Sequence, residues 1–297
     1  MITIMTPTYN RAYILKEAYN SLKRQSSFEF EWIVVDDGST DETEEIVRRW
    51  VEEEKNFSIV YEKQKNGGKH RAVNKGVSLA KYDYFLILDS DDRLTKNAVT
   101  LIHTWIAEIT DLNGFAGVAG LRGNINTVIE ETHQKKYIDA TNLERQKFNI
   151  FVEQAEVYKT EILRKYPFPE FDGENFIRES AVWDRIAKDG WKLRWHNEIV
   201  YLWDYIEDGL TKNTSLQTYV KNFLGFTYCV KLFLETHGFM PSLNKCGEFR
   251  RVAKMKGIKL VESAKLLGTH TTYFVIGIWY YRVRQLVKFI FAKKARK

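Results

Sequence analysis

The feature of this sequence that most constrains its fold is a regular alternation of short apolar runs with amphipathic segments in the N-terminal third. In the amphipathic segments, apolar residues recur every three or four positions, which is the periodicity of one face of a helix. Strands and helices that alternate in this way predict a parallel sheet covered by helices on both faces. The expected strands span residues 2–5, 30–35, 57–61 and 82–88, and the expected helices span 11–25, 41–55 and 69–80.

The rest of the chain is less regular and then changes character. Beyond residue 212 the composition shifts to long helical segments and to a final stretch, 271–297, that is apolar and then basic. We therefore predict an α/β domain over residues 1–212 and a helical extension over 213–297. The further elements expected are strands at 115–121, 155–158 and within 191–203, and helices at 161–165, 176–188, 216–235 and 243–255.

Composition narrows the class of protein. The 297 residues are 44% hydrophobic and 14% aromatic, which is enough for one large domain with a substantial extension. The two cysteines, Cys229 and Cys246, are too few for a disulfide framework or a zinc site, and they fit a reducing compartment. The apolar run at residues 1–5 ends too early for the hydrophobic region of a signal peptide, so we expect no cleavable signal there.

The net charge of +6 is concentrated in the last part of the sequence. Residues 282–297 hold seven Lys or Arg and no Asp or Glu, and the remaining chain is close to neutral. A basic excess confined to one tail argues against a broad nucleic-acid surface and indicates a local anionic partner.

The segment before and within this basic tail suggests what that partner is. Residues 266–281 carry no charged side chain, but they are too few for a full hydrocarbon span, and residues 282–294 then mix apolar with basic side chains. This composition is typical of a helix that lies at the surface of an anionic membrane. The alternative is a helix packed on the rest of the protein with a frayed basic end.

Three carboxylates lie within four positions in the run Asp89-Ser90-Asp91-Asp92, directly after the expected strand at 82–88. Like charges this close raise each other's pKa unless a positive group lies among them. The usual positive group is Mg²⁺ or Mn²⁺, held by one or two carboxylates and by phosphate oxygens. Since open parallel sheets bind ligands at the carboxyl ends of their strands, the run predicts a metal–phosphate site. The alternative is a solvated acidic turn that caps a helix starting near Thr95.

Three further loops should open onto the same edge of the sheet. They span residues 6–11, 36–41 and 66–76, and they hold hydrogen-bonding groups for a base and ribose and cations for phosphates. No Gly-x-Gly-x-x-Gly follows the first strand and no P-loop lysine motif is present, which argues against a dinucleotide-binding fold and a P-loop NTPase. For Asp36 and Asp41 two roles stay open: ligand contact, or capping of the turn and of the helix that follows.

These motifs resemble those of the family 2 glycosyltransferases with the GT-A fold, of the kind that builds bacterial surface polysaccharides. The matching segments are 6–11, 35–41, 67–76 and 88–92, in the family's order and at its spacing. The likeness covers roughly residues 1–205 and is specific over the first hundred. It implies that residues 1–212 are a GT-A catalytic domain with a mainly parallel sheet, whose halves bind the nucleotide (about 1–110) and the acceptor (about 111–212).

The resemblance also implies a chemistry and positions for it. The donor would be a nucleotide-sugar, most often a UDP-sugar, used with Mn²⁺ or Mg²⁺ and with inversion at the anomeric carbon. Asp37 would accept a hydrogen bond from the base, most often from uracil N3–H. Asp91 and Asp92 would reach the ribose and the metal–diphosphate, with Asp89 as a neighbouring metal candidate. The remaining donor contacts implied by position are Pro7, Thr8, Asn10, Arg11, Lys69, Arg71 and Asn74.

Inverting transfer also needs a general base that removes the proton of the acceptor hydroxyl. By resemblance this is a carboxylate before a helix in the second half, often in a Glu-Asp pair; the matching residue is Glu179, although Ser180 replaces the second acid. An alternative role for Glu179 is a salt bridge with Arg178 or Arg185. The rival candidates for the base are Asp172, Glu174 and Asp184.

The resemblance and the composition of the tail together predict partners and a location. We expect a nucleotide-sugar donor, a saccharide or lipid-linked saccharide acceptor, peripheral contact with an anionic membrane at its inner, cytoplasmic face, and no nucleic acid. Two other functions stay open. One is a catalytically silent nucleotide-sugar-binding or scaffold subunit, for which Ser180 is the hint. The other is a nucleotidyltransferase, although residues 6–11 lack the Gly-rich basic signature of such enzymes. For His196 a metal-ligand role and a packed core role are both open.

Overall fold

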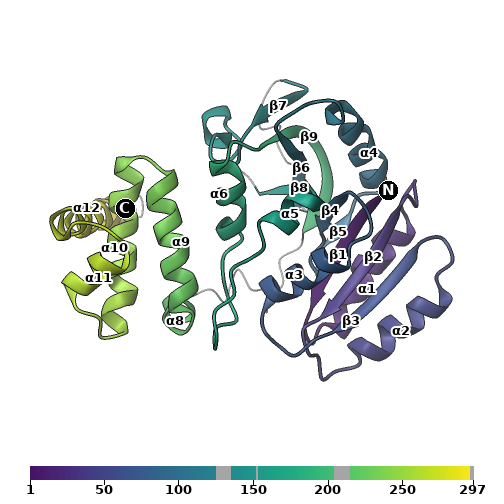
Figure 1. Cartoon of the computed structure of the whole chain (residues 1–297), viewed down its shortest axis with the longest axis horizontal. Coiled ribbons are helices and arrows are strands. Elements are labelled where there is room, and N and C mark those ends of the chain that lie inside the picture. Colours follow the sequence, from purple (N-terminus) through teal and green to yellow (C-terminus); the bar gives the residue numbers. More distant parts are fainter. Residues whose placement is uncertain (125–134, 152, 204–214, 295–297) are drawn as a thin grey trace. The chain divides into compact units, whose positions relative to one another are not determined.

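The computed structural model describes residues 1–124, 135–151, 153–203 and 215–294, with side chains up to residue 291. The chain forms two compact units (Figure 1). Unit 1 comprises Met1–Phe168 and Arg185–Gly209, and unit 2 comprises Pro169–Asp184 and Leu210–Lys297. The expected domain boundary at residues 212–213 lies outside the described residues, as do residues 295–297 of the basic tail.

Unit 1 alternates strands with helices, as the sequence predicts. Its strands are β1 (Ile2–Thr8), β2 (Phe30–Asp36), β3 (Ser58–Lys63), β4 (Tyr84–Ile87), β5 (Arg93–Leu94), β6 (Phe115–Asn124), β7 (Tyr137–Ala140), β8 (Gln154–Lys159) and β9 (Lys192–Trp203). Its helices are α1 (Ala12–Lys23), α2 (Thr43–Glu53), α3 (Lys69–Leu79), α4 (Ala98–Ile109) and α5 (Thr160–Lys165). Helix α6 (Ser180–Lys188) contains the boundary between the two units.

Within the described residues these strands form one nine-stranded sheet, in the order β3-β2-β1-β4-β8-β6-β9-β5, with β7 paired to β9. Strand β1 runs parallel to β2 and β4, and β2 runs parallel to β3. Strand β8 lies antiparallel between β4 and β6, and β6 is parallel to β9. The predicted α/β fold with a mainly parallel central sheet is confirmed.

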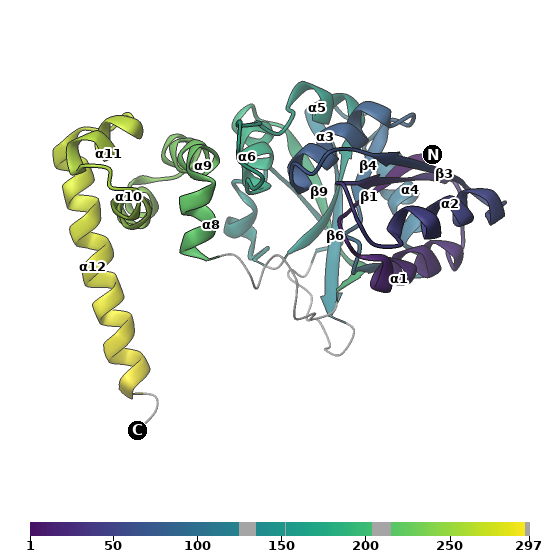
Figure 2. The same cartoon turned by 90° about the horizontal axis from the view of Figure 1, so that it is seen from below.

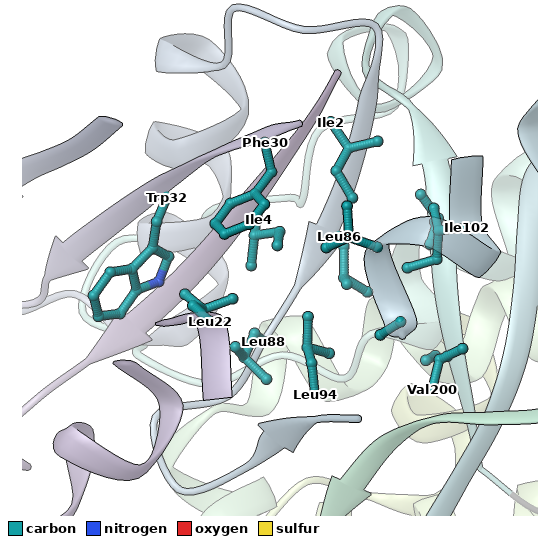
Figure 3. Packing of buried hydrophobic residues seen from close by; sticks show 14 of the residues in the cluster. Ile2, Ile4, Leu22, Phe30, Trp32, Leu86, Leu88, Leu94, Ile102 and Val200 are labelled. Atoms are coloured by element: carbon teal, nitrogen blue, oxygen red, sulfur yellow. The ribbon is translucent and has the colours of Figure 1, made fainter. Parts of the chain in front are cut away.

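The core of unit 1 lies where one face of this sheet meets the covering helices. Alternate residues of a strand face the same side, so Ile2 and Ile4 of β1 pack with Phe30 and Trp32 of β2 and with Leu86 of β4 (Figure 3). All five side chains are buried. Burying an apolar side chain of this size stabilises the fold by about 1.5–3 kcal/mol. The apolar residues of β1, β2 and β4 therefore stabilise the central part of the sheet.

Register brings the ends of three parallel strands to one edge of the sheet. Thr8 at the end of β1 pairs with Asp36 at the end of β2. Met5 of β1 pairs with Ile87 at the end of β4. The loops that follow β1, β2 and β4 therefore leave the sheet side by side, where parallel sheets bind ligands.

Unit 2 contains a group of helices that pack around aromatic side chains. They are α8 (Leu216–Lys221), α9 (Phe223–Thr236), α10 (Phe239–Met255), α11 (Leu260–Leu266) and α12 (Thr271–Lys294). Phe249 of α10 stacks on Phe226 with ring centroids 5.8 Å apart and meets Phe274 of α12 edge-on. Gly247 lets α10 and α12 approach closely, because a Cβ there would lie 2.1 Å from Cβ of Tyr281. None of the helices in the described part of the chain is long and apolar enough to cross a membrane.

Several element boundaries differ from the sequence prediction. The helix expected at 216–235 is divided at Asn222, whose side-chain oxygen accepts hydrogen bonds from the backbone of Asn175 and Phe176. The helix expected from residue 176 begins only at Ser180, and the helix expected near Thr95 begins later, as α4. The strand β7 and the helix α11 have no counterpart in the prediction.

Candidate functional site

Asp36 and Asp41, whose roles the sequence leaves open, both make capping bonds. Asp36 is buried, and its carboxylate accepts hydrogen bonds from the Ser39 N–H (2.7 Å) and the Tyr61 hydroxyl (2.6 Å). Oδ1 of Asp41 accepts a hydrogen bond of 3.2 Å from the N–H of Thr43, the first residue of the helix α2 that follows it, and Oδ2 accepts one of 3.0 Å from the N–H of Ala12 in α1. These bonds hold the loops in place, which favours the capping role for both residues.

The end of β1 and the loop that follows it carry four of the expected donor contacts. Asn10 has a left-handed backbone (φ 51°), and its side-chain oxygen accepts a hydrogen bond of 2.8 Å from the Thr40 N–H, which ties this loop to the one after β2. Pro7 and Thr8 are buried at the end of β1, and the Thr8 hydroxyl has no hydrogen-bond partner among the described residues. A buried hydroxyl of this kind is a group that a ligand can satisfy. The positive charge of Arg11 adds to the lowering of the pKa of Asp89 and opposes the rise in the pKa of Asp91.

Asp37 joins the loop after β2 to the glycine turn before α3. Its Oδ1 accepts hydrogen bonds from the Gln64 amide (2.7 Å) and the Gly67 N–H (2.9 Å), and its Oδ2 accepts one from the Gly68 N–H (2.7 Å). A carboxylate has about four acceptor positions, so one remains for a ligand donor. The sequence prediction selected Asp37 as a base contact and missed its role in holding the turn.

Helix α3 brings its first residues to the acidic run. Nζ of Lys69 lies 2.6 Å from Oδ1 of Asp89. Arg71 packs over Gly67, where a Cβ would come within 2.7 Å of its Cδ, so a side chain at this position would displace the arginine. The amide of Asn74 instead bonds the backbone of Phe168 at both ends, through Nδ2 (2.9 Å) and Oδ1 (2.8 Å). This places Asn74 as a link between α3 and the chain after α5.

The carboxylates of the acidic run have unequal surroundings. Burial opposes ionisation of Asp89, but the Lys69 ammonium and the Arg122 guanidinium hold its pKa below the usual value. Burial and the negative charge of Asp89 raise the pKa of Asp91, and they raise that of Asp92 to about 7. The carboxylate of Asp91 makes no hydrogen bond or ion pair with another residue that the structure describes. Asp91 is therefore the carboxylate with the least compensated charge.

Arg122 and Tyr201, which sequence reasoning missed, hold Asp92. Nη2 of Arg122 and the hydroxyl of Tyr201 each donate a hydrogen bond of 2.8 Å to Oδ2 of Asp92. The same hydroxyl accepts a bond of 3.0 Å from the Asp89 N–H. The two side chains come from paired positions of β6 and β9, and the guanidinium lies 4.3 Å from the centre of the Tyr201 ring. The bonds from Arg122 and Tyr201 thus fix both ends of the acidic run. In the sequence, the one indication of this role was that Arg122 is a single charged residue in the apolar strand β6.

The oxygen ligands of this cluster fit a divalent cation bound together with a phosphate. In the part of the chain that the structure describes, no three His, Cys, Asp or Glu side chains are grouped so that the protein alone would hold a metal. Mg²⁺ is commonly held by only one or two carboxylates, with phosphate oxygens and water in the other positions, and Mn²⁺ also prefers such oxygen ligands. Asp91 and Asp92 carry carboxylate oxygens of this kind, and a cation bound beside them would favour the charged form of these carboxyl groups, whose pKa values are raised.

The candidates for the general base lie in unit 2 and differ in what they contact. Both oxygens of Glu174 accept backbone hydrogen bonds at the start of α9, from Leu224 (2.7 Å) and Gly225 (2.8 Å), so Glu174 caps this helix. Glu179 is exposed and precedes α6, and its carbonyl accepts the first helical N–H bonds. Asp172 is exposed, and Asp184 is buried within α6.

His196 lies in the core of unit 1, away from the acidic run. Its ring stacks on Trp105 with centroids 4.4 Å apart, and burial lowers its pKa to about 4. Nε2 is 3.7 Å from a carboxylate oxygen of Glu108. A neutral, stacked histidine corresponds to the core role that the sequence left open.

Solved structures of other proteins share this fold. Over 95% of this chain and 89% of the other, the fold matches S. aureus TarS 1–349 in complex with UDP-GlcNAc, with a TM-score of 0.63 and 18% identity. Mannosyltransferase PcManGT from Pyrobaculum calidifontis, in complex with GDP-Man and Mn²⁺, matches over 94% and 86% with a TM-score of 0.56 and 17% identity. The fold is that of a GT-A glycosyltransferase. Residues 3–166 match the family described as "Glycosyl transferase family 2", and the chain belongs to this family.

Several curated relatives are named as bacterial glycosyltransferases. The abequosyltransferase RfbV of Salmonella typhimurium is 36% identical over 115 residues, which are 38% of this chain and 34% of RfbV. The glycosyltransferase GlyG of Streptococcus pneumoniae is 32% identical over 36% of each chain. The match thus spans about a third of these two relatives. The GalNAc(5)-diNAcBac-PP-undecaprenol beta-1,3-glucosyltransferase of Campylobacter jejuni is 22% identical over 78% of this chain and 73% of its own length.

Proposed function

We propose that this glycosyltransferase moves a sugar from a nucleotide-sugar, most simply a UDP-sugar, to a polysaccharide or lipid-linked acceptor, with a divalent metal and with inversion at the anomeric carbon. The observation that carries the proposal is the cluster of Asp89, Asp91 and Asp92 at the end of β4, flanked by the cations Lys69 and Arg122. Paired carboxylates and cations at the carboxyl edge of a parallel sheet fit a metal–diphosphate.

The base and ribose would bind at the loops after β1 and β2. The free acceptor position of Asp37 suits the N3–H donor of uracil, and the buried hydroxyl of Thr8 can pair with a ribose or base atom. Pro7, Asn10 and Arg71 would line this part of the site; Asn74 would act through the position of α3.

The diphosphate would lie against the acidic run. Mn²⁺ or Mg²⁺ would be held by Asp91 and Asp92 with Asp89 beside them, and when bound it compensates the charge that develops on the leaving diphosphate. Lys69 and Arg11 would add positive charge on the same side. Arg122 and Tyr201 would keep Asp92 oriented before and during the reaction.

Glu179 is our candidate for the general base. The acceptor oxygen would form a bond to the anomeric carbon while the bond from that carbon to the diphosphate oxygen breaks, and Glu179 would take the hydroxyl proton. The nucleoside diphosphate leaves with the bonding electrons. The capping bonds of Glu174 weigh against it as the base, and Asp172 and Asp184 stay as rivals.

The acceptor and the location rest on the basic tail and on the names of relatives. RfbV transfers abequose by name, TuaG of Bacillus subtilis is a putative teichuronic acid biosynthesis enzyme, and the Campylobacter enzyme is named for an undecaprenol-linked substrate. The tail of seven cations and no acid in residues 282–297 would suit peripheral contact with an anionic membrane. We propose a position at the inner face of the cell membrane.

A nucleotide-sugar screen tests the proposal. A ligand that binds only the native state raises its melting temperature, so UDP-sugars with Mn²⁺ should stabilise the protein and chelator should remove the effect. The stabilising donor should then release UDP. Preference for a GDP-sugar would overturn the UDP assignment, donor binding without turnover would favour a silent subunit, and pyrophosphate release from a nucleoside triphosphate would favour nucleotidyl transfer.

A further inference from the structure

Helix α12 has two apolar faces, and only one of them is covered within unit 2. Phe274 and Tyr281 are buried, and they form part of the face that packs on α10. From Arg282 to Phe291 every residue is exposed, and Figure 2 shows this half of the helix extending past α10 and α11. The second apolar face is therefore not part of the core of this unit.

The uncovered face is a continuous stripe along the helix. Successive residues of an α-helix turn by about 100°, so side chains three, four and seven positions apart share a face. The stripe lies on the side opposite Phe274 and Tyr281, and all six of its members are exposed, Trp279 (66%) and Leu286 (60%) the most. Its members are Ile276, Trp279, Val283, Leu286, Val287 and Ile290.

A pocket of about 360 Å³ borders this stripe, between α9, α10 and α12. Tyr280 and Arg284 line it; Tyr280 lies four positions after the stripe residue Ile276, and Arg284 lies three positions before the stripe residue Val287. Lys245 is the other basic side chain of the lining. The pocket thus combines positive charge with an adjoining apolar surface.

The polar groups of the pocket are only partly satisfied by one another. Nζ of Lys245 pairs with Glu248 at 2.6 Å and lies 5.2 Å from the centre of the Phe233 ring. Nδ2 of Asn244 also donates to Glu248, at 3.1 Å, which leaves its Oδ1 buried without a hydrogen-bond partner in the described part of the chain. Two cations against one acid suit an anionic group, and Oδ1 of Asn244 suits a hydroxyl beside it.

We propose that the stripe docks on an anionic phospholipid bilayer and that the bordering pocket receives the phosphate of a hydroxyl-bearing lipid headgroup. This inference rests on the membrane contact of the proposed function and assigns it to particular residues. The apolar stripe would lie at the headgroup boundary, with Arg282, Arg284 and Lys288 beside it at the level of the phosphates.

Charge favours a bilayer over a second copy of the chain as the occupant. No Asp or Glu lies between residues 263 and 297, where eight Lys or Arg are found. Two such stripes facing each other would bring like charges together without an acidic partner, which costs free energy. An anionic lipid surface provides the opposite charge over the full length of the helix.

Vesicle binding of the full-length protein tests the stripe. Binding to phosphatidylcholine vesicles that contain phosphatidylglycerol should be strong, and Val283→Gln should lower the partition coefficient by about fivefold, as expected for losing part of the burial of one Val. The matched control is Val261→Gln, the same change at an exposed valine of α11 outside the stripe. Equal losses for the two variants would overturn the assignment of the surface.

A second matched pair tests the pocket. Arg284→Gln and Arg282→Gln remove the same charge from exposed positions of α12, but only Arg284 lines the pocket. If the arginines contribute only general attraction to the anionic surface, the partition coefficient should fall about fivefold in either variant. If the pocket binds a headgroup, the partition coefficient should fall more than tenfold in Arg284→Gln and in Lys245→Gln. Equal effects at positions 282 and 284 would refute the headgroup site.

The same samples separate this inference from the proposed transfer reaction. UDP binding and UDP release report on the acidic run of unit 1, and vesicle binding reports on α12. If the protein ignores phosphatidylglycerol vesicles at low salt, or if Val283→Gln instead dissociates a dimer in sedimentation, the membrane assignment is wrong even where UDP is released. If the protein binds vesicles but uses no nucleotide-sugar donor, the proposed transfer reaction is wrong and the assignment of the stripe as a membrane-binding surface is unaffected.

Discussion

The change Tyr201→Phe should weaken both the fold and the donor site, because one hydroxyl holds two parts of the acidic run. Tyr201 is buried in β9, and its hydroxyl donates to Asp92 at 2.8 Å and accepts from the Asp89 N–H at 3.0 Å. Phenylalanine keeps the ring beneath Arg122 and removes only the oxygen. The carboxylate loses a donor and the backbone N–H loses its acceptor.

The magnitude follows from these two bonds. A hydrogen bond to a carboxylate contributes about 1.5–3 kcal/mol and a neutral backbone bond contributes about 0.5–1.5 kcal/mol. We therefore expect the free energy of unfolding to fall by about 2–4 kcal/mol. Because the lost bond favours the charged form of Asp92, the pKa of this carboxyl, raised by burial to about 7, should rise further. The apparent affinity for metal and donor should fall accordingly at neutral pH.

Denaturant unfolding and donor calorimetry check this prediction, with Tyr84→Phe as the control. Tyr84 lies partly buried on β4, and its hydroxyl makes no hydrogen bond within the described residues. The control should change the unfolding free energy by less than about 0.5 kcal/mol. If Tyr201→Phe is no worse than the control in stability and in Mn²⁺-dependent donor binding, the bonds of the Tyr201 hydroxyl have no energetic role.

Three further predictions concern the nucleotide, the base and the core. Asp37→Ala should weaken UDP binding by about 1.5–3 kcal/mol in calorimetry, and unchanged affinity would remove Asp37 from the site. Glu179→Gln should retain donor affinity and lower the rate of sugar transfer by about a hundredfold to ten-thousandfold. If only an Asp172 or Asp184 variant shows this loss of rate with unchanged donor affinity, that residue and not Glu179 is the general base. The buried His196 has a pKa of about 4, below its usual value, so the unfolded chain binds the proton more tightly. The free energy of unfolding should be highest above pH ~6.5 and should fall by up to about 3 kcal/mol as the pH is lowered toward 4. The variant His196→Phe should show a weaker pH dependence in this range, and an unchanged pH dependence would contradict this role of His196.

Local patterns were enough to predict the first half of the sheet. The apolar runs that became β1, β2 and β4 also determine the edge at which their loops meet, since parallel strands in register end together. The loops of Asp37 and of the acidic run were therefore expected at one edge of the sheet, whereas the roles of their residues came from the resemblance to family 2 glycosyltransferases. Capping by Asp36 and Asp41 was also among the roles left open, because an Asp side chain at a loop end readily accepts hydrogen bonds from the backbone of the turn or helix that follows.

The missing parts of the site depend on contacts that are distant in sequence. Arg122 is 30 residues and Tyr201 is 109 residues from Asp92, and they reach it only because β6 and β9 pair through several register shifts. No local pattern encodes such a register. The role of Asn74 was missed for the same reason, since its partner Phe168 lies 94 residues away. The sequence alone could not show that α12 has a second, uncovered apolar face, because this depends on which of its apolar residues pack on α10.

The measurement that most directly tests the central claim is Mn²⁺-dependent UDP release from a UDP-sugar by the full chain and by Asp91→Asn. Asp91 makes no bond to another described side chain, so the isosteric change should leave the fold intact. The matched control is Asp111→Asn, at an exposed carboxyl after α4. We predict a loss of about a hundredfold or more in Asp91→Asn, an unchanged control, and no turnover of the wild type in excess chelator. Full activity of Asp91→Asn, or of the wild type in chelator, would contradict a metal-dependent transfer at this acidic run.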